Sequence, residues 1–140
     1  MGLVSSLQID HQTERTIPYF ISFIFFTSTW WLLSKAPLSP IVAQLMLGAS
    51  IAILLTGFIN LKMKISAHLV GIGGVTGAFL MIGFNGFHDY NFNVIASVFI
   101  AGCLGWARLQ LNAHTPREVY SGFILGVFCQ ILADKLTWFL

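Results

Sequence analysis

The stretch AHLVGIGGVTGAFLMIGFNGF, residues 67–87, decides the fold, because His68 is the one ionisable side chain in it. About twenty residues of apolar helix are enough to cross the hydrocarbon core of a bilayer. Apolar and polar residues do not alternate along it, so a strand of a membrane β-barrel is not expected. The stretch therefore predicts a transmembrane helix.

Four more apolar runs share this character, and short polar connectors separate them. Hydrophobic residues make up 56% of the 140 residues and charged residues 9%, whereas soluble domains are about a quarter charged. Short connectors place consecutive helices side by side and antiparallel. We expect an all-α bundle of about five membrane-spanning helices, forming one integral-membrane domain over residues 1–140. The other four runs cover residues 17–34, 41–61, 92–107 and 119–139.

The rest of the composition excludes other classes of protein. The net charge of +2 is too small and too dispersed for a nucleic-acid surface. Cys103 and Cys129 lie inside apolar runs, where a thiol behaves as a small hydrophobic group. Residues 1–16 lack the pattern of a cleaved signal peptide and are polar enough to lie on the membrane surface.

Two pairs of glycines have the spacing that allows helices to pack closely in lipid. They are Gly73-x-x-x-Gly77 and Gly122-x-x-x-Gly126, and small residues four positions apart allow backbones to approach each other. A match to the dinucleotide fingerprint that begins at Gly71 fails at Thr76, and no strand precedes it. The glycines therefore predict helix packing.

Two polar boxes interrupt the apolar chain: KISAH at residues 64–68, and the pattern Arg108-x5-His114-x3-Glu118. An ionisable group beside hydrocarbon costs several kcal/mol by most estimates, so each one is a candidate functional residue. If every run crosses the membrane once, both boxes and Arg15 lie on the same side.

Five of the seven lysines and arginines are also expected on that side, which has two explanations. The positive-inside rule would make it the cytoplasmic side without reference to function. Alternatively, the basic residues surround an anionic ligand at the membrane surface. The five are Arg15, Lys62, Lys64, Arg108 and Arg117.

The first box precedes a predicted helix and resembles an anion site. The Ser66 hydroxyl is placed to cap that helix by accepting a hydrogen bond from a backbone N–H group. The free N–H groups and the helix dipole also favour an anion there. His68, in the first turn, could present its imidazole to that anion, although a lone histidine is more often a packing residue.

The second box reads as the start of another helix, with Thr115 as the cap and Pro116 as its first residue. Glu118 could close a capping box onto Thr115. It could equally accept a hydrogen bond from His114 and fix the tautomer of that ring. Arg108 suits bidentate binding of phosphate oxygens. Lys62 and Arg117 are expected to be helix-end residues that extend toward water.

Arg108-x5-His114-x3-Glu118 resembles the third signature of the type 2 phosphatidic acid phosphatase superfamily, Ser-Arg-x5-His-x3-Asp. Ala107 stands where that signature has serine, and Glu118 where it has aspartate.

The rest of the resemblance is looser. Residues 66–68, Ser-Ala-His, are similar to the second signature, Pro-Ser-Gly-His, without its proline and glycine. Residues 14–18, Glu-Arg-Thr-Ile-Pro, lie where the first signature, Lys-x6-Arg-Pro, belongs, but the lysine is absent. The family core has six helices, so we expect at least one N-terminal helix to be missing.

The resemblance implies a metal-independent phosphatase without a cofactor, in a bacterial cytoplasmic membrane. In it, His114 would attack phosphorus, Glu118 would orient His114, and His68 would protonate the leaving oxygen. Arg108 and Ser66 would bind the phosphoryl oxygens of a phosphorylated lipid. Arg15 and Lys64 are further candidates for that role.

Two other hypotheses remain open. One is a binding or assembly protein, as one part of a larger bundle or as a homo-oligomer, whose polar boxes only set helix ends. A degenerate relative that binds lipid phosphate without hydrolysing it belongs to the same class. The other is a metal site, in which His68 or His88 joins His114 and Glu118. A cation beside Arg108 would be repelled, so no metal ligand is predicted.

Overall fold

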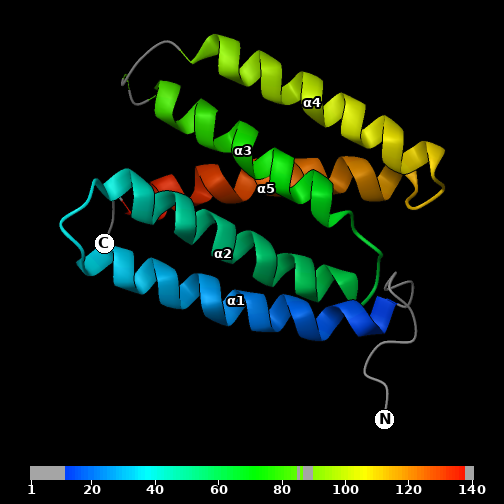
Figure 1. The fold of residues 1–140 in the computed structure, drawn as a ribbon, viewed down its shortest axis with the longest axis horizontal. Coiled ribbons are helices and arrows are strands. Elements are labelled where there is room, and N and C mark those ends of the chain that lie inside the picture. Colours follow the sequence, from blue (N-terminus) through cyan, green and yellow to red (C-terminus); the bar gives the residue numbers. More distant parts are fainter. Residues whose placement is uncertain (1–11, 85, 87–89, 138–140) are drawn as a thin grey trace.

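The computed structural model describes residues 12–84, 86 and 90–137, with side chains from residue 16 onward. Five α-helices follow one another in this part of the chain (Figure 1), which confirms the all-α prediction. Each is long and apolar enough to cross a membrane, and together they indicate an integral membrane protein. The helices are α1 (Gln12–Lys35), α2 (Pro40–Asn60), α3 (Ala67–Phe84), α4 (Asn91–Gln110) and α5 (Pro116–Thr137).

Consecutive helices run in opposite directions, and α5 packs behind the layer formed by the other four (Figure 1). It contacts α2, α3 and α4, with its most extensive contact on α3. Among the described residues α1 packs on α2 alone, while α4 packs on α3 and α5. The α3–α5 pair is thus the centre of the bundle.

The glycine pairs pack helices closely, as the sequence predicts, and the two helices that they bring together are α3 and α5. A Cβ atom at Gly122 would lie 2.8 Å from the carbonyl oxygen of Ser66, and one at Gly126 would overlap the carbonyl of Val70. In the other direction, a Cβ at Gly77 would lie 2.8 Å from the carbonyl oxygen of Val127. Only glycine permits this backbone approach. Its consequence is that the first turns of α3 and α5 lie against each other.

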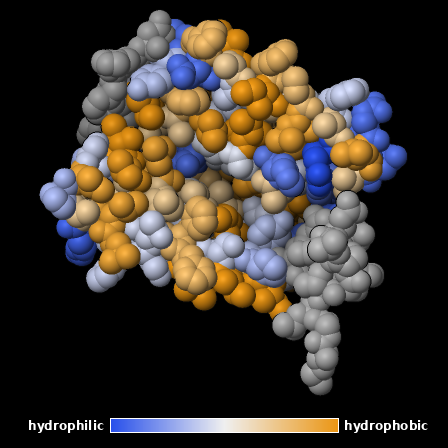
Figure 2. Space-filling model, viewed as in Figure 1, coloured by the Kyte–Doolittle hydropathy of each residue, from blue (hydrophilic) through white to orange (hydrophobic). Residues whose placement is uncertain are grey.

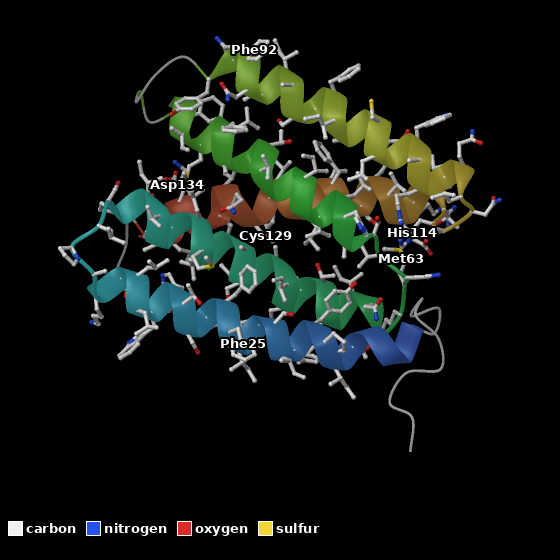
Figure 3. The ribbon with its side chains drawn as sticks, in the orientation of Figure 1. Phe25, Met63, Phe92, His114, Cys129 and Asp134 are labelled. Atoms are coloured by element: carbon white, nitrogen blue, oxygen red, sulfur yellow. The ribbon has the colours of Figure 1, made fainter. Side chains whose placement is uncertain are left out.

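The outside of the bundle is apolar, and small polar groups pair within it. Phe25 and Phe92 are 67% and 80% exposed on the outer helices (Figure 3). Inside, the Thr76 hydroxyl donates a hydrogen bond to the Ser97 hydroxyl at 3.0 Å, linking α3 to α4. This distribution is expected for helices that face lipid, where buried polar groups pair between helices.

Helix α3 ends at Phe84, before the end of its apolar run, whereas three other helix boundaries lie outside the runs. Helix α1 begins at Gln12, so residues 12–16 are helical, while residues 1–11 of the expected surface segment lie outside the described part of the chain. Helix α4 continues to Gln110 and holds Arg108 in its last turn, where the helix dipole favours a cation. Helix α5 begins at Pro116. In each case polar residues at the membrane boundary belong to the helix, although hydropathy alone leaves them out.

Candidate active site

The polar boxes meet at the end of the bundle where α1, α3 and α5 begin and α2 and α4 end (Figure 1). The Ser66 N–H group, just before α3, donates a hydrogen bond to the Glu118 carbonyl in the first turn of α5, at 3.3 Å. The two boxes, which are distant in sequence, therefore form one structural unit.

Among the described residues at this end, His114 is the most enclosed ionisable one, with 1% of its side chain exposed (Figure 3). Its Nδ1 atom lies 3.0 Å from the carbonyl oxygen of Lys64 and 3.1 Å from Oε2 of Glu118. Both partners are acceptors, so Nδ1 must carry the proton. In the neutral ring the lone pair is then on Nε2, which has no hydrogen-bond partner in the described part of the chain.

The surroundings also keep the His114 ring neutral. Burial lowers the pKa of His114 below its ordinary value, and the positive charge of Arg108 acts in the same direction. The hydrogen bonds to Glu118 and to the Lys64 carbonyl raise the pKa, but they do not offset the burial. At neutral pH His114 therefore presents an unprotonated Nε2 atom, which is the form of imidazole that can act as a nucleophile.

Glu118 fulfils both roles that the sequence leaves open. Its Oε2 atom accepts a hydrogen bond from the Thr115 N–H group at 3.0 Å, which is half of a capping box. The same oxygen accepts the hydrogen bond from His114. The start of α5 and the orientation of the His114 ring thus depend on one carboxylate.

Arg108 and Ser66 each bring a buried polar atom that has no partner in the described part of the chain. They are the Nε atom of Arg108 and the Oγ atom of Ser66. Buried polar groups are nearly always hydrogen-bonded, so each such atom requires an explanation. An anion would supply acceptor oxygens to either atom, and Arg108 lies close enough to His114 to affect its pKa.

The predicted cap by the Ser66 hydroxyl is wrong, because that oxygen makes no hydrogen bond. Close packing fixes the start of α3 instead: the N–H group of Ser66 is bound to Glu118 and its carbonyl lies against Gly122. The Ser66 hydroxyl is therefore buried without a hydrogen bond in the described part of the chain.

The side chains of the remaining predicted residues make no hydrogen bond to His114 in the described part of the chain. His68 lies exposed in the first turn of α3 and does not hydrogen-bond to His114, whose described partners are Lys64 and Glu118. Lys64 contributes its backbone carbonyl to the site, which sequence reasoning missed because a backbone atom leaves no residue signature. The side chain of Arg15 lies outside the described part of the structure, as does His88. No group of three or more His, Cys, Asp or Glu side chains placed to hold a metal ion occurs among the residues described.

Comparisons with known proteins do not assign this chain to a family. It matches no protein-family model, no curated protein and no solved structure.

Proposed function

We propose that this protein hydrolyses the phosphate of a membrane lipid through a phosphohistidine formed on His114, as the resemblance to the type 2 phosphatidic acid phosphatases implies. The observation that carries the proposal is the pair of acceptors on Nδ1 of a buried, neutral His114. That arrangement leaves Nε2 as a positioned nucleophile.

In the first step, Nε2 of His114 attacks phosphorus and the bond from phosphorus to the lipid oxygen breaks. The leaving oxygen takes a proton from His68, which is exposed in the first turn of α3. The phosphorylated ring retains its Nδ1 proton and becomes cationic, so the carboxylate of Glu118, 3.1 Å away, stabilises it.

In the second step, a water molecule attacks the phosphohistidine. The nitrogen–phosphorus bond breaks, His114 is restored to its neutral form, and the proton lost by water passes to His68. The Arg108 guanidinium and the Ser66 hydroxyl bind the equatorial oxygens, because phosphoryl transfer depends mainly on positioning and on stabilisation of negative charge. No metal ion takes part.

The position of His114 relative to the membrane supports a lipid substrate. His114 lies between two candidate membrane spans, after Gln110 and before Pro116. A phosphate at this level would be the headgroup of a lipid in the adjacent leaflet. Phosphatidic acid, phosphatidylglycerol phosphate and a polyprenyl pyrophosphate all present that group. The family resemblance also implies a bacterial cytoplasmic membrane, and we include this location in the proposal.

The test is phosphate release from these three lipids in detergent, by the wild type and by His114→Ala, with Lys35→Ala at the opposite end of the bundle as the control. Wild type and control should turn over at least one lipid, and His114→Ala should lose at least about a thousandfold in rate. Quenching in alkali should trap an acid-labile phosphoryl group on the wild type and on Lys35→Ala, but not on His114→Ala.

Three results would overturn the proposal. Turnover by His114→Ala at the wild-type rate would exclude His114 as the nucleophile. Loss of activity in chelator, restored by added metal, would favour a metal site. If no lipid is turned over, the protein is a lipid-phosphate-binding or assembly protein.

A further inference from the structure

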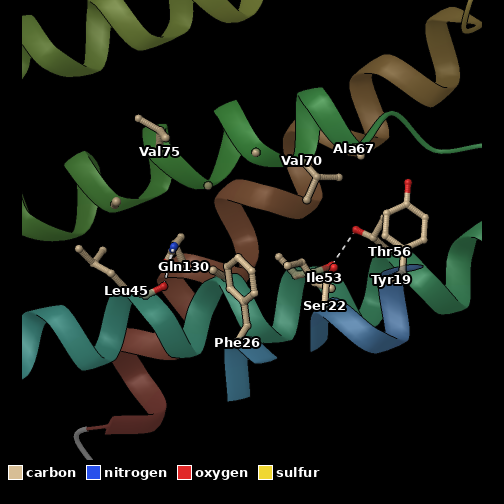
Figure 4. A pocket seen from close by; sticks show the side chains of 15 residues that line it. Tyr19, Ser22, Phe26, Leu45, Ile53, Thr56, Ala67, Val70, Val75 and Gln130 are labelled. Carbon is tan, nitrogen blue, oxygen red and sulfur yellow. Dashed lines mark hydrogen bonds between the residues drawn. The ribbon is translucent and has the colours of Figure 1, made fainter. Parts of the chain in front are cut away.

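A cavity of about 620 Å³ lies between α1, α2, α3 and α5 (Figure 4). Pockets that hold small ligands have about 300–1,000 Å³. On α3 the wall includes Ala67, Gly71, Gly74 and Ala78, whose spacing of three and four residues places them on one helix face. Figure 2 shows apolar side chains around a hollow on this face of the molecule. We call this cavity the α2–α3 groove.

The depth of the groove matches one lipid chain in one leaflet. It begins at Ala67, the first residue of α3, and reaches Ala78. Eleven residues of α-helix rise by about 16 Å, which is about half of the roughly 30 Å hydrocarbon core. The groove therefore extends from the end of the bundle that holds His114 to near the middle of the membrane.

The end of the groove at Ala67 adjoins the candidate active site. Ala67 directly follows Ser66, whose buried hydroxyl has no partner in the described part of the chain. His68 lies seven residues before Val75, a wall residue of the groove, and this spacing places both on one face of α3. A lipid with its phosphate beside Ser66 and His114 would thus direct a chain into the groove.

A hydrogen bond between α5 and α2 fixes the wall of the groove that faces α5. Gln130 is 7% exposed and lines the groove, and its Nε2 atom donates a hydrogen bond to the Leu45 carbonyl of α2 at 3.2 Å (Figure 4). This bond joins α5 to α2 behind the groove. Because the wall is tied in this way, an entering chain need not first separate the helices.

We propose that the α2–α3 groove binds one hydrocarbon chain of the phosphorylated lipid, an inference that rests on the proposed function. A second groove of about 410 Å³ lies between α3, α4 and α5 and is the competing location. The α2–α3 groove is larger and has walls from four helices rather than three, so it covers more of a chain.

Two open glycines provide a matched pair of variants. A Cβ atom added at Gly71, in the α2–α3 groove, or at Gly102, in the second groove, would meet no atom within 4 Å. Leucine is also a better helix former than glycine. Gly71→Leu and Gly102→Leu should therefore fold with an unfolding temperature no lower than that of the wild type, while Gly71→Leu narrows the α2–α3 groove and Gly102→Leu narrows the second one.

The probe is phosphatidic acid with a diazirine at the end of one long chain, photolysed in detergent and mapped by peptide mass spectrometry. Wild type and Gly102→Leu should be labelled on α2, α3 and α5 around the groove. Gly71→Leu should lose at least about tenfold in labelling, since displacement of two methylene groups changes affinity by about that factor. Its KM for long-chain phosphatidic acid should rise about tenfold, with turnover of the dihexanoyl lipid unchanged.

Loss of labelling in Gly102→Leu instead of Gly71→Leu would overturn the proposal and assign the chain to the second groove. Labelling confined to the outer helix faces would also overturn it. The photolabel reports binding without turnover, so it separates this inference from the proposed function. A protein that hydrolyses lipid phosphate without groove labelling refutes the groove alone, and one that is labelled there without hydrolysis refutes the phosphatase alone.

Discussion

Helices begin at both ends of this bundle, but the two ends begin them differently. Ser39 before α2 and Tyr90 before α4 make no side-chain cap hydrogen bond. At the other end, Glu118 accepts hydrogen bonds from Thr115 and His114, and its carbonyl accepts one from Ser66. The first end shows that helices of this bundle can start without such a network. The hydrogen bonds at the second end are therefore more than helix starts require. We interpret the additional ones, above all that between Glu118 and His114, as functional.

The two ends also differ in whether their charged side chains have partners. The carboxylate of Asp134, near the end of α5, lies 3.7 Å from the ammonium of Lys135 (Figure 3 labels Asp134). At the His114 end, the Nε atom of Arg108 is buried without a partner in the described part of the chain. A cation without a described partner beside a neutral histidine is consistent with the phosphate site that we propose.

The largest expected difference between the ends is in kcat/KM, when Arg108→Gln at one end is compared with Lys135→Gln at the other. Loss of one group that stabilises the developing negative charge costs about 10² to 10³ in rate, so Arg108→Gln should lower kcat/KM for a lipid phosphate by that factor. Lys135→Gln should leave it within about twofold. Phosphate release measures both, and an equal loss in the two variants would remove the functional distinction between the ends.

Glu118→Gln should have the next largest effect, because a misplaced reacting group costs up to about a hundredfold in rate. Glutamine can still accept the hydrogen bond from Thr115, so the helix start is retained.

The pH dependence separates this effect from misfolding. Because only neutral His114 can attack, the rate should rise with pH through the pKa of His114, which burial lowers below the ordinary value of about 6.5. The hydrogen bond to Glu118 raises that pKa, so Glu118→Gln should move the rise to lower pH. A pH–rate profile that moves to higher pH would contradict the assignment.

Ser66→Ala should reduce turnover by up to about tenfold, since it removes one hydrogen bond to the phosphate. It should not lower the thermal unfolding temperature, because the hydroxyl has no partner in the described structure, and removal of an unpaired buried hydroxyl is neutral or stabilising. A cap role would instead lower the unfolding temperature and leave turnover intact.

Ser39→Ala should show the smallest effect. Ser39 precedes Pro40 and makes no side-chain cap hydrogen bond, so turnover and thermal unfolding should both stay close to wild type. A marked loss of stability would show that the helix starts at the two ends are more alike than we infer.

Local patterns predicted much of the fold and part of the site. Five helices follow from apolar runs of membrane length, and the contact between Glu118 and Thr115 follows from a spacing of three residues at a helix start. Predictions that depended on packing were less accurate. The Ser66 hydroxyl does not cap α3, and polar residues such as Arg108 extend the helices beyond their apolar runs.

By itself the sequence determined an all-α membrane bundle, its antiparallel order and the end at which its polar boxes lie, because hydropathy and helix caps act over a few turns of one segment. Only the tertiary structure placed the Lys64 carbonyl on His114, fifty residues away, and opened a groove below Ser66. The first of these depends on how closely the glycines allow α3 and α5 to approach. That distance is set by contacts between segments, which the order of residues in either helix does not reveal.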